Sequence, residues 1–308
     1  MSEKNILVSV VVITYNSSET VIETLDSIYK QTYQNLELII SDDCSKDDTV
    51  TICENWIKNN KDRFKKTLLI TTPVNTGTSG NLNRAINRIS GVWCKSLAAD
   101  DRLLPDCIEK CIKHIEKHPK QRIIFSKVKG FGNMEAARKW PFKNVKWLFD
   151  TLSSKEMKIL LTQRNFLPAA SVIIKKDVYD QIGGFNESIP LLEDWPFWVK
   201  AVFNNIPLSF YDEEVVEYRF GDNSISQGEN GLSQVYKESY RKSAQYAHGF
   251  LKDVSSFMRF YSWTLRLQKN GFYLGKLLHA VNILNPDYYK QKQAMKKYQY
   301  FIDHHIEL

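Results

Sequence analysis

Strand-like and helix-like segments alternate over the first hundred residues, and this alternation most constrains the fold. Residues 8–13 read Val-Ser-Val-Val-Val-Ile, a β-branched run typical of a strand that is buried on both faces. Residues 19–31 then carry apolar side chains at helical spacing. Further strand-like segments at 36–40, 67–71 and 95–99 alternate with helix-like segments at 49–59 and 79–89. This order predicts an α/β domain with a doubly wound, mostly parallel sheet flanked by helices.

Polar loops follow three of these strands, at residues 14–18, 41–45 and 98–102. In doubly wound sheets, ligands bind outside the carboxyl ends of the strands. We therefore expect the three loops to meet on one rim. Neither G-x-G-x-x-G nor G-x-x-x-x-G-K-[ST] occurs in the chain, so neither a dinucleotide fingerprint nor a P-loop explains them.

The rest of the sequence predicts that the α/β domain continues and is followed by a helical region. Strands are expected at 122–127, 170–174 and 214–220, with helices over 105–118 and from residues 176 and 190. From about residue 232 the pattern is helical and basic. We expect one α/β domain over residues 1–228 and a basic helical C-terminal region over 229–308.

Charge is concentrated in that C-terminal region. Residues 226–308 contain 12 Lys/Arg and 6 Asp/Glu, a net of 12 − 6 = +6, which leaves +1 of the total +7 for the rest. Either a helical bundle carries solvated charges, or the region lies on an anionic membrane surface with its aromatic side chains at the headgroups. Nucleic acid is not an expected partner, because no nucleic-acid-binding motif accompanies the charge.

Two further features narrow the class of protein. No apolar run reaches the roughly 18 residues of a membrane span, and the start of the chain does not resemble a secretory signal. The five cysteines are scattered and lack C-x-x-C spacing, which predicts neither a disulfide framework nor a zinc site. We expect a cytoplasmic protein, peripheral on the inner face of the plasma membrane if its C-terminal region binds lipid.

Three acidic pairs are the candidate chemical groups: Asp42-Asp43, Asp100-Asp101 and Glu193-Asp194. Adjacent carboxylates at a strand end offer hard oxygen ligands to Mg²⁺ or Mn²⁺. Each pair also has a structural explanation, because acidic residues cap helices and complement the positive helix N-terminus.

Five motifs in order resemble the family 2 glycosyltransferases with the GT-A fold. They are V-V-V-I-T-Y-N, S-I-Y-K-Q-T-Y, E-L-I-I-S-D-D-C-S-K-D-D-T, L-A-A-D-D and L-L-E-D-W, within residues 6–225. The resemblance implies that Thr14, Tyr15, Asn16 and Asp43 bind the nucleotide of a nucleotide-sugar. It also implies that Asp101 binds Mn²⁺ or Mg²⁺, that Asp100 contacts the ribose or supports the metal, and that Arg219 contacts a phosphate. By position, Asp194 is the general base and Glu193 its neighbour.

Two positions depart from the family pattern. Ala98 replaces the first acid of the usual metal motif, which leaves the number of metal ligands open. Leu82 stands where the family has an arginine, so we expect no donor role for the helix over 79–89. The turn Gly183-Gly184-Phe185 fits the family pattern near the acceptor.

The predicted function is inverting transfer of a sugar from a nucleoside diphosphate donor, with a UDP-sugar preferred. The acceptor would be a hydroxyl of a polysaccharide or of a lipid-linked glycan. Two alternatives stay open at this stage. The chain could be a non-catalytic nucleotide-sugar-binding module, which the missing acid at Ala98 permits, or a glycoside hydrolase that uses two carboxylates.

Overall fold

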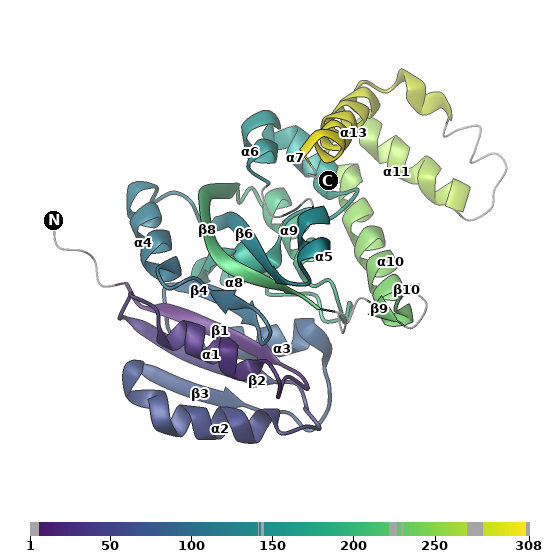
Figure 1. The fold of residues 1–308 in the computed structure, drawn as a ribbon. Coiled ribbons are helices and arrows are strands. Elements are labelled where there is room, and N and C mark those ends of the chain that lie inside the picture. The colour runs from purple at the N-terminus through teal and green to yellow at the C-terminus, as the bar shows by residue number, and fades with distance from the viewer. Residues whose placement is uncertain are drawn as a thin grey trace.

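The computed structural model describes residues 6–140, 142, 145–221, 227–228, 231–269 and 280–305 (Figure 1). Ser224 and Ser226, which follow the Arg219 segment, lie outside the described residues, as does the expected boundary at residue 229. The strands are β1 Val8–Thr14, β2 Leu36–Asp42, β3 Lys66–Ile70, β4 Trp93–Ala98, β5 Arg102–Leu103, β6 Ile123–Gly132, β7 Ile173–Lys175, β8 Leu208–Phe220, β9 Gln227–Gly228 and β10 Gly231–Leu232.

The α-helices are α1 Val21–Tyr29, α2 Thr49–Asn60, α3 Gly77–Ile86, α4 Cys107–Lys117, α5 Met134–Lys139, α6 Lys146–Thr151, α7 Ser154–Leu161, α8 Lys176–Ile182, α9 Asp194–Phe203, α10 Gln234–Gly249, α11 Ser256–Lys269 and α13 Pro286–His305. Short 3₁₀ turns cover η1 Lys61–Arg63, η3 Ala169–Ser171, η4 Phe250–Asp253 and η5 Val281–Leu284.

Within the described residues, strands β1–β8 form one mixed sheet in the order β3-β2-β1-β4-β7-β6-β8-β5. The first four strands pair in parallel, as the βαβ alternation predicts, because each crossover passes through a helix. Strand β7 is antiparallel to both β4 and β6, and β8 is parallel to β6. The sheet is therefore doubly wound and mostly parallel in its N-terminal half, and this half lies at the lower left of Figure 1.

Helices cover both faces of the sheet, which explains the nearly continuous apolar strands. One core cluster joins alternate strand residues such as Val10 and Leu38 to helices α1, α2 and α4. The other joins Val11 and Ile39 to helices α3, α7, α8 and α9. Side chains of a strand point alternately to its two faces, so a strand between two helical layers must be apolar throughout.

The second half of the fold differs in detail from the sequence-based expectation. Strand β8 begins at Leu208, six residues before the predicted start, and pairs along β6 as far as Phe220. Residues 130–161 form the end of β6 and the helices α5, α6 and α7, and Ser153 and Glu156 make a capping box at the start of α7. Trp195, Phe197 and Trp198 of α9 are buried and belong to the core.

The C-terminal helices continue from this body. Helix α10 lies against α9, and α13 lies against α7, where Lys297 pairs with Glu156 and Lys155 pairs with Asp287. Helices α11 and α13 extend away from the sheet at the upper right of Figure 1. In the part of the chain that the structure describes, no helix is both long enough and apolar enough to cross a membrane. The five cysteines are all free thiols.

Candidate functional site

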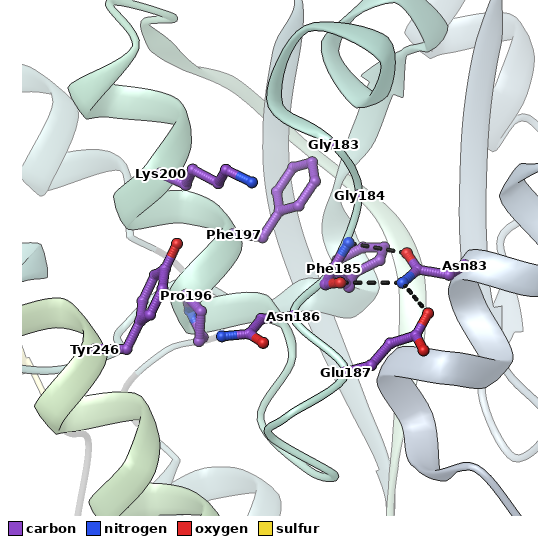
Figure 2. A pocket seen from close by; sticks show the side chains of 10 residues that line it. All are labelled: Asn83, Gly183, Gly184, Phe185, Asn186, Glu187, Pro196, Phe197, Lys200 and Tyr246. Atoms are coloured by element: carbon purple, nitrogen blue, oxygen red, sulfur yellow. Dashed lines mark hydrogen bonds between the residues drawn. The ribbon is translucent and has the colours of Figure 1, made fainter.

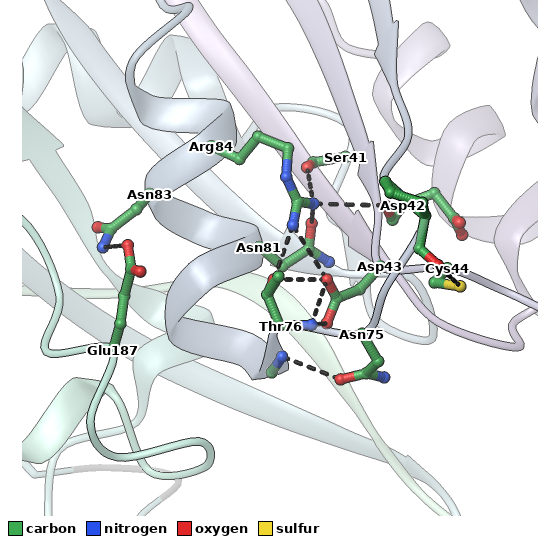
Figure 3. A network of polar contacts seen from close by, with 12 residues as sticks. Ser41, Asp42, Asp43, Cys44, Asn75, Thr76, Asn81, Asn83, Arg84 and Glu187 are labelled. Carbon is green, nitrogen blue, oxygen red and sulfur yellow. Dashed lines mark hydrogen bonds and ion pairs between the residues drawn. The ribbon is translucent and has the colours of Figure 1, made fainter.

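The carboxylate of Asp43 sits at the end of β2 and is bound by helix α3 and the turn before it (Figure 3). Both of its oxygens accept hydrogen bonds from the Thr76 backbone N–H, at 3.0 and 2.9 Å, and Oδ1 also accepts from the Thr76 hydroxyl at 2.6 Å. The guanidinium of Arg84 makes an ion pair with Oδ1 at 3.1 Å. Asp43 is thus buried and paired, and its position at the edge of the sheet is determined by α3 and the turn before it.

The first polar loop meets the second one beside Asp43. The Thr14 hydroxyl donates to Asp42 at 2.8 Å, and the Thr14 carbonyl accepts from the Asp43 backbone N–H at 3.0 Å. The Asn16 side chain accepts from the Lys46 backbone N–H at 2.7 Å. Tyr15 remains 43% exposed between these contacts. Thr14 and Asn16 therefore shape the loop, while the ring of Tyr15 is open to solvent.

The Asp100-Asp101 pair lies where β4 ends, beside the end of β8. Asp101 is buried, and its Oδ1 accepts a hydrogen bond from the Arg219 backbone N–H at 2.9 Å. The Asp100 carbonyl accepts from Arg219 Nε at 2.9 Å, whereas the Asp100 side chain is exposed. Desolvation raises the pKa of the Asp101 carboxyl well above its usual value, and the neighbouring charge of Asp100 raises it further. A cation at this point would relieve the repulsion between the two carboxylates.

The side chain of Arg219 is held by residues from two other elements. Its Nη2 pairs with Glu23 of α1 at 2.6 Å, and its guanidinium lies 4.5 Å from the ring centre of Phe131 on β6. Arg102 contacts the same ring at 3.9 Å and pairs with Glu23 and Glu217. Arg219 thus lies beside the acid pair, as a phosphate contact requires, but its guanidinium already has a carboxylate partner.

The Glu193-Asp194 pair lies at the start of helix α9. Asp194 is buried, its Oδ2 accepts from the Asn165 side chain at 2.7 Å, and its Oδ1 accepts from the Trp195 backbone N–H at 2.8 Å. Desolvation raises the pKa of Asp194. Desolvation, followed by the charge of Asp194, raises the pKa of Glu193 to about 8. The pair can therefore hold a proton near neutral pH, which is a property of general acid–base groups.

Helix α10 fixes the segment that precedes this pair. The hydroxyl of Ser239 accepts from the Leu191 backbone N–H at 3.3 Å, and the hydroxyl of Ser243 donates to the Leu192 carbonyl at 3.4 Å. Both serines are fully buried. Leu192 adopts a left-handed conformation with φ of +60°, which is unusual for a branched residue and is held here by these contacts. The C-terminal region thus contributes to the placement of Glu193 and Asp194.

Tyr218 lies on β8, directly before Arg219. Desolvation raises the pKa of its hydroxyl, and the charges of Asp101, Asp100 and Asp194 raise it further. The backbone N–H of the next residue, Arg219, binds Asp101 Oδ1 at 2.9 Å, so Tyr218 lies close to the Asp100-Asp101 pair. Its ring stacks on Trp140 with centroids 5.3 Å apart. The stacked rings of Trp140 and Tyr218 therefore lie near the end of β4, where Arg219 binds Asp101.

Helix α3 also binds the loop that leads to α9. The Asn83 side chain accepts from the Phe185 backbone N–H at 2.8 Å and donates to the Phe185 carbonyl at 3.0 Å and to Glu187 at 2.7 Å. Ser79 donates to the Ile189 carbonyl at 2.9 Å. Gly77, with φ of +75°, approaches Pro190 so closely that a Cβ would lie 2.8 Å from the Pro190 oxygen. One helix thus contacts Asp43 through Arg84 and the 185–190 loop through Asn83.

A pocket of about 510 Å³ opens beside this loop (Figure 2). Its lining comes from α3, from the Gly183-Gly184-Phe185 turn, and from helices α9 and α10: Asn83, Gly183, Gly184, Phe185, Asn186, Glu187, Pro196, Phe197, Lys200 and Tyr246. It adjoins the face of α9 that carries Pro196 and Lys200. The Gly183-Gly184-Phe185 turn, which the family resemblance predicts to lie near the acceptor, therefore lines this pocket.

Asp101 fits a metal site only if the bound donor supplies further ligands to the metal. Among the described residues, no three His, Cys, Asp or Glu side chains form a group that could hold a metal ion. Asp101 supplies one buried carboxylate, and Ala98 is apolar, as the sequence shows. Mg²⁺ and Mn²⁺ commonly bind through one or two carboxylates, with substrate phosphates and water completing the shell. A cation shared between Asp101 and a diphosphate is consistent with this donor set.

Several site residues were not found by sequence reasoning. The structure brings Arg84 to Asp43, although no donor role was expected of its helix, so that expectation overlooked the nearest cation. Thr76, Asn83, Asn165 and Tyr218 were also missed. The Asn75-Thr76-Gly77 turn after β3 was the available signal, because polar turns at strand ends face the rim where ligands bind.

The comparisons with known proteins agree with this fold. The family described as Glycosyl transferase family 2 matches residues 9–183, more than half of the chain. An uncharacterized glycosyltransferase of Methanocaldococcus jannaschii is 29% identical over 75% of this chain and 75% of its own length. An uncharacterized glycosyltransferase of Haemophilus influenzae is 30% identical over 71% of this chain and 67% of its own length.

Solved structures resemble the whole fold. S. aureus TarS aligns with a TM-score of 0.60 at 18% identity, covering 86% of this chain and 45% of that chain. TarS 1-349 in complex with UDP-GlcNAc aligns with a TM-score of 0.60, covering 96% and 90%. The mannosyltransferase PcManGT from Pyrobaculum calidifontis, in complex with GDP-Man and Mn²⁺, aligns with a TM-score of 0.53 at 15% identity, covering 94% and 86%. The sheet, the order of the polar loops and the family match agree, and the chain belongs to the family 2 glycosyltransferases.

Proposed function

We propose that this glycosyltransferase transfers a sugar with inversion, from a nucleoside diphosphate donor to a hydroxyl of a polysaccharide or lipid-linked glycan. The observation that carries the proposal is the buried carboxylate of Asp194 at the start of α9, which Asn165 and the Trp195 backbone N–H hold in place, in a chain that also buries Asp101 just after β4. Single displacement needs a carboxylate that accepts the proton of the attacking hydroxyl on the side opposite the leaving group. Membership of a transferase family favours this reaction over a binding module or a hydrolase.

On the donor side, Tyr15 would stack on the base and Asp43 would accept its N–H, with Thr14 and Asn16 shaping the loop. The exposed ring of Tyr15 beside the buried Asp43 supports this assignment. TarS binds UDP-GlcNAc and PcManGT binds GDP-Man, and we propose a UDP-sugar for this chain. Asp100 would contact the ribose, and Arg219 would contact a phosphate after giving up its pairing with Glu23.

Asp101 would hold Mn²⁺ or Mg²⁺ together with the donor diphosphate, and the bound ion would neutralise charge on the departing nucleoside diphosphate. On the acceptor side, Asp194 would take the proton of the attacking hydroxyl. Asn165 holds its Oδ2 in place, and Glu193 would tune its protonation by repulsion. The Gly183-Gly184-Phe185 turn and its pocket would border the acceptor. We also propose residues 1–228 as the catalytic domain and 229–308 as an extension that contacts the inner face of the plasma membrane.

The test is substitution of the proposed base. Asp194→Asn should reduce transfer by at least about 10³-fold, the usual order for loss of a catalytic proton acceptor, while the Kd for UDP in the presence of Mn²⁺ stays unchanged by titration calorimetry. Asp180→Asn, an exposed carboxylate on α8, is the matched control and should retain wild-type transfer. Full turnover by Asp194→Asn would refute the assignment. Unchanged UDP affinity in Asp101→Asn with and without Mn²⁺ would refute the metal role.

A further inference from the structure

The C-terminal helices expose a cluster of apolar side chains far from the sheet. Helix α11 carries Phe257, Phe260 and Trp263 at intervals of three residues, and η5 carries Val281, Ile283 and Leu284. Five of these six side chains are 37–59% exposed, and Leu284 is 78% exposed. We call these six residues the C-terminal apolar patch. A contiguous exposed apolar surface usually marks an interaction site, whereas single exposed apolar residues do not.

Hydrogen bonds join the two elements that carry the patch. The Asn282 side chain donates to the Thr264 hydroxyl at 3.0 Å, and the Asn285 side chain donates to the Phe257 carbonyl at 3.0 Å. Phe260 and Trp263 lie next to each other with ring centroids 5.8 Å apart. Residues 281–284 are thus fixed along α11, and apolar side chains from both elements reach solvent in the same part of the molecule.

The charge around the patch indicates its partner. Helix α11 contains Arg259, Arg266 and Lys269 and no acidic residue. The side chain of Arg259 is exposed on α11, and that of Lys252 is exposed on the preceding turn η4. Among the described residues 250–269 and 280–297, Asp253 is exposed, and the remaining acid, Asp287, is buried and paired with Lys155. A basic surface that carries Trp, Phe and aliphatic side chains matches an anionic lipid headgroup layer over an apolar interior.

We infer that the C-terminal apolar patch inserts into the surface of an anionic membrane. This inference assigns the membrane contact of the proposed function to specific residues. It rests on the proposed function in one respect, namely that membrane binding would bring the enzyme to a lipid-linked acceptor. A second copy of the chain fits this surface less well, because two like basic patches repel each other. Insertion of three aromatic and three aliphatic side chains would add to the attraction between Lys/Arg and anionic headgroups.

The test is co-sedimentation of the full chain with vesicles, without donor or acceptor. The vesicles are phosphatidylcholine alone or an equimolar mixture of phosphatidylcholine and phosphatidylglycerol. We expect wild type to bind the mixed vesicles at least about tenfold more tightly than the neutral ones, and to lose that binding at high salt. The triple variant Phe257→Ser, Phe260→Ser, Trp263→Ser should lose most of the binding, also by about tenfold or more.

The matched control changes three exposed apolar residues outside the patch: Val74→Ser, Val92→Ser and Met134→Ser. It should sediment like wild type, and circular dichroism should show that both triple variants stay folded. Absence of vesicle binding by wild type, or equal binding by the two triple variants, would overturn the inference. A wild-type dimer by light scattering that the patch variant dissociates, without vesicle binding, would instead assign the patch to self-association.

The vesicle experiment separates this inference from the proposed function. Asp194→Asn should bind mixed vesicles like wild type even though it does not transfer sugar. If transfer to a soluble acceptor persists in the patch variant while vesicle binding is lost, both proposals stand. If wild type binds vesicles but Asp194→Asn retains full transfer, the proposed base is wrong and the membrane contact stands.

Discussion

Arg84 and Asp43 form an ion pair over 3.1 Å between α3 and the end of β2, although 41 residues separate them in the sequence. The carboxylate is almost completely buried and the guanidinium is partly exposed. Removing one partner of such a pair leaves the other charge desolvated without compensation. The pair therefore holds the candidate nucleotide loop in its conformation before any donor binds.

Arg84→Gln should weaken UDP binding by about tenfold, equivalent to about 1.4 kcal/mol. The reason is that Asp43 loses its cation and the loop beside Tyr15 loses its support. Titration calorimetry of UDP measures the effect. Arg88 lies four residues further along the chain and is exposed. The Kd of Arg88→Gln for UDP should therefore match that of wild type. An unchanged Kd in Arg84→Gln would show that the pair does not organise the nucleotide site.

Asn83→Ala should separate catalysis from donor binding. The substitution removes the two bonds to the Phe185 backbone and the bond to Glu187, which releases the loop that leads to Asp194. We expect kcat to fall by about tenfold, or 1.4 kcal/mol of transition-state stabilisation, while the Kd for UDP stays constant because Arg84 is untouched. Asn87→Ala, an exposed neighbour on the same chain segment, is the control. An equal loss in kcat and UDP affinity would contradict this division of roles.

The acid limb of the pH–rate profile should depend on Glu193. Desolvation and the charge of Asp194 raise the pKa of Glu193 to about 8, so the fully ionised pair forms only as the pH rises toward that value. Transfer should therefore increase with pH up to about 8. In Glu193→Gln the group that ionises at about pH 8 is absent, so the acid limb should move to lower pH. If the acid limb of the pH–rate profile has the same position in Glu193→Gln as in wild type, electrostatic coupling between Glu193 and Asp194 is excluded.

The same shift predicts a change in stability with pH. The pKa of Glu193 is higher in the folded state than its ordinary value of 4.5. Its contribution to stability is therefore fully present below pH 4.5 and is lost as the pH rises toward 8. Glu193→Gln should raise the melting temperature at pH 8 more than at pH 5, as measured by differential scanning calorimetry. A uniform effect at both pH values would contradict the folded-state pKa shift.

Lys95 should be required for stability. This buried side chain of β4 donates to the carbonyls of Ala170 at 2.5 Å and Val172 at 3.1 Å. Lys95→Met would leave both carbonyls without that donor, at a cost of about 1–3 kcal/mol for each unsatisfied group. Urea denaturation measures the loss, and the exposed Lys65→Met should stay near wild type. A variant as stable as wild type would show that water or repacking replaces the ammonium.

The sequence was sufficient for the parts of the fold that local pattern governs. The apolar run at 8–13 became β1, which is buried because helices cover both faces, and the acidic residues at 42–43 and 100–101 fell at strand ends as expected. Strand β8 was predicted too short because Leu208–Tyr211 is only partly buried, so it lacks a continuous apolar signal. Its extent is decided by pairing with β6, a partner more than 80 residues away.

The site shows the same division. Tyr15, Asp43, Asp101 and Asp194 could be proposed as site residues from the sequence, because each lies within a short motif of the family that the chain resembles. Arg84 and Asn83 could not, since their roles arise from hydrogen bonds across 41 and 102 residues. Local order follows from side-chain periodicity and turn residues, which neighbours in sequence can specify. Only the packed sheet and its helices decide which distant side chains meet, because burial and ion pairing depend on positions in space.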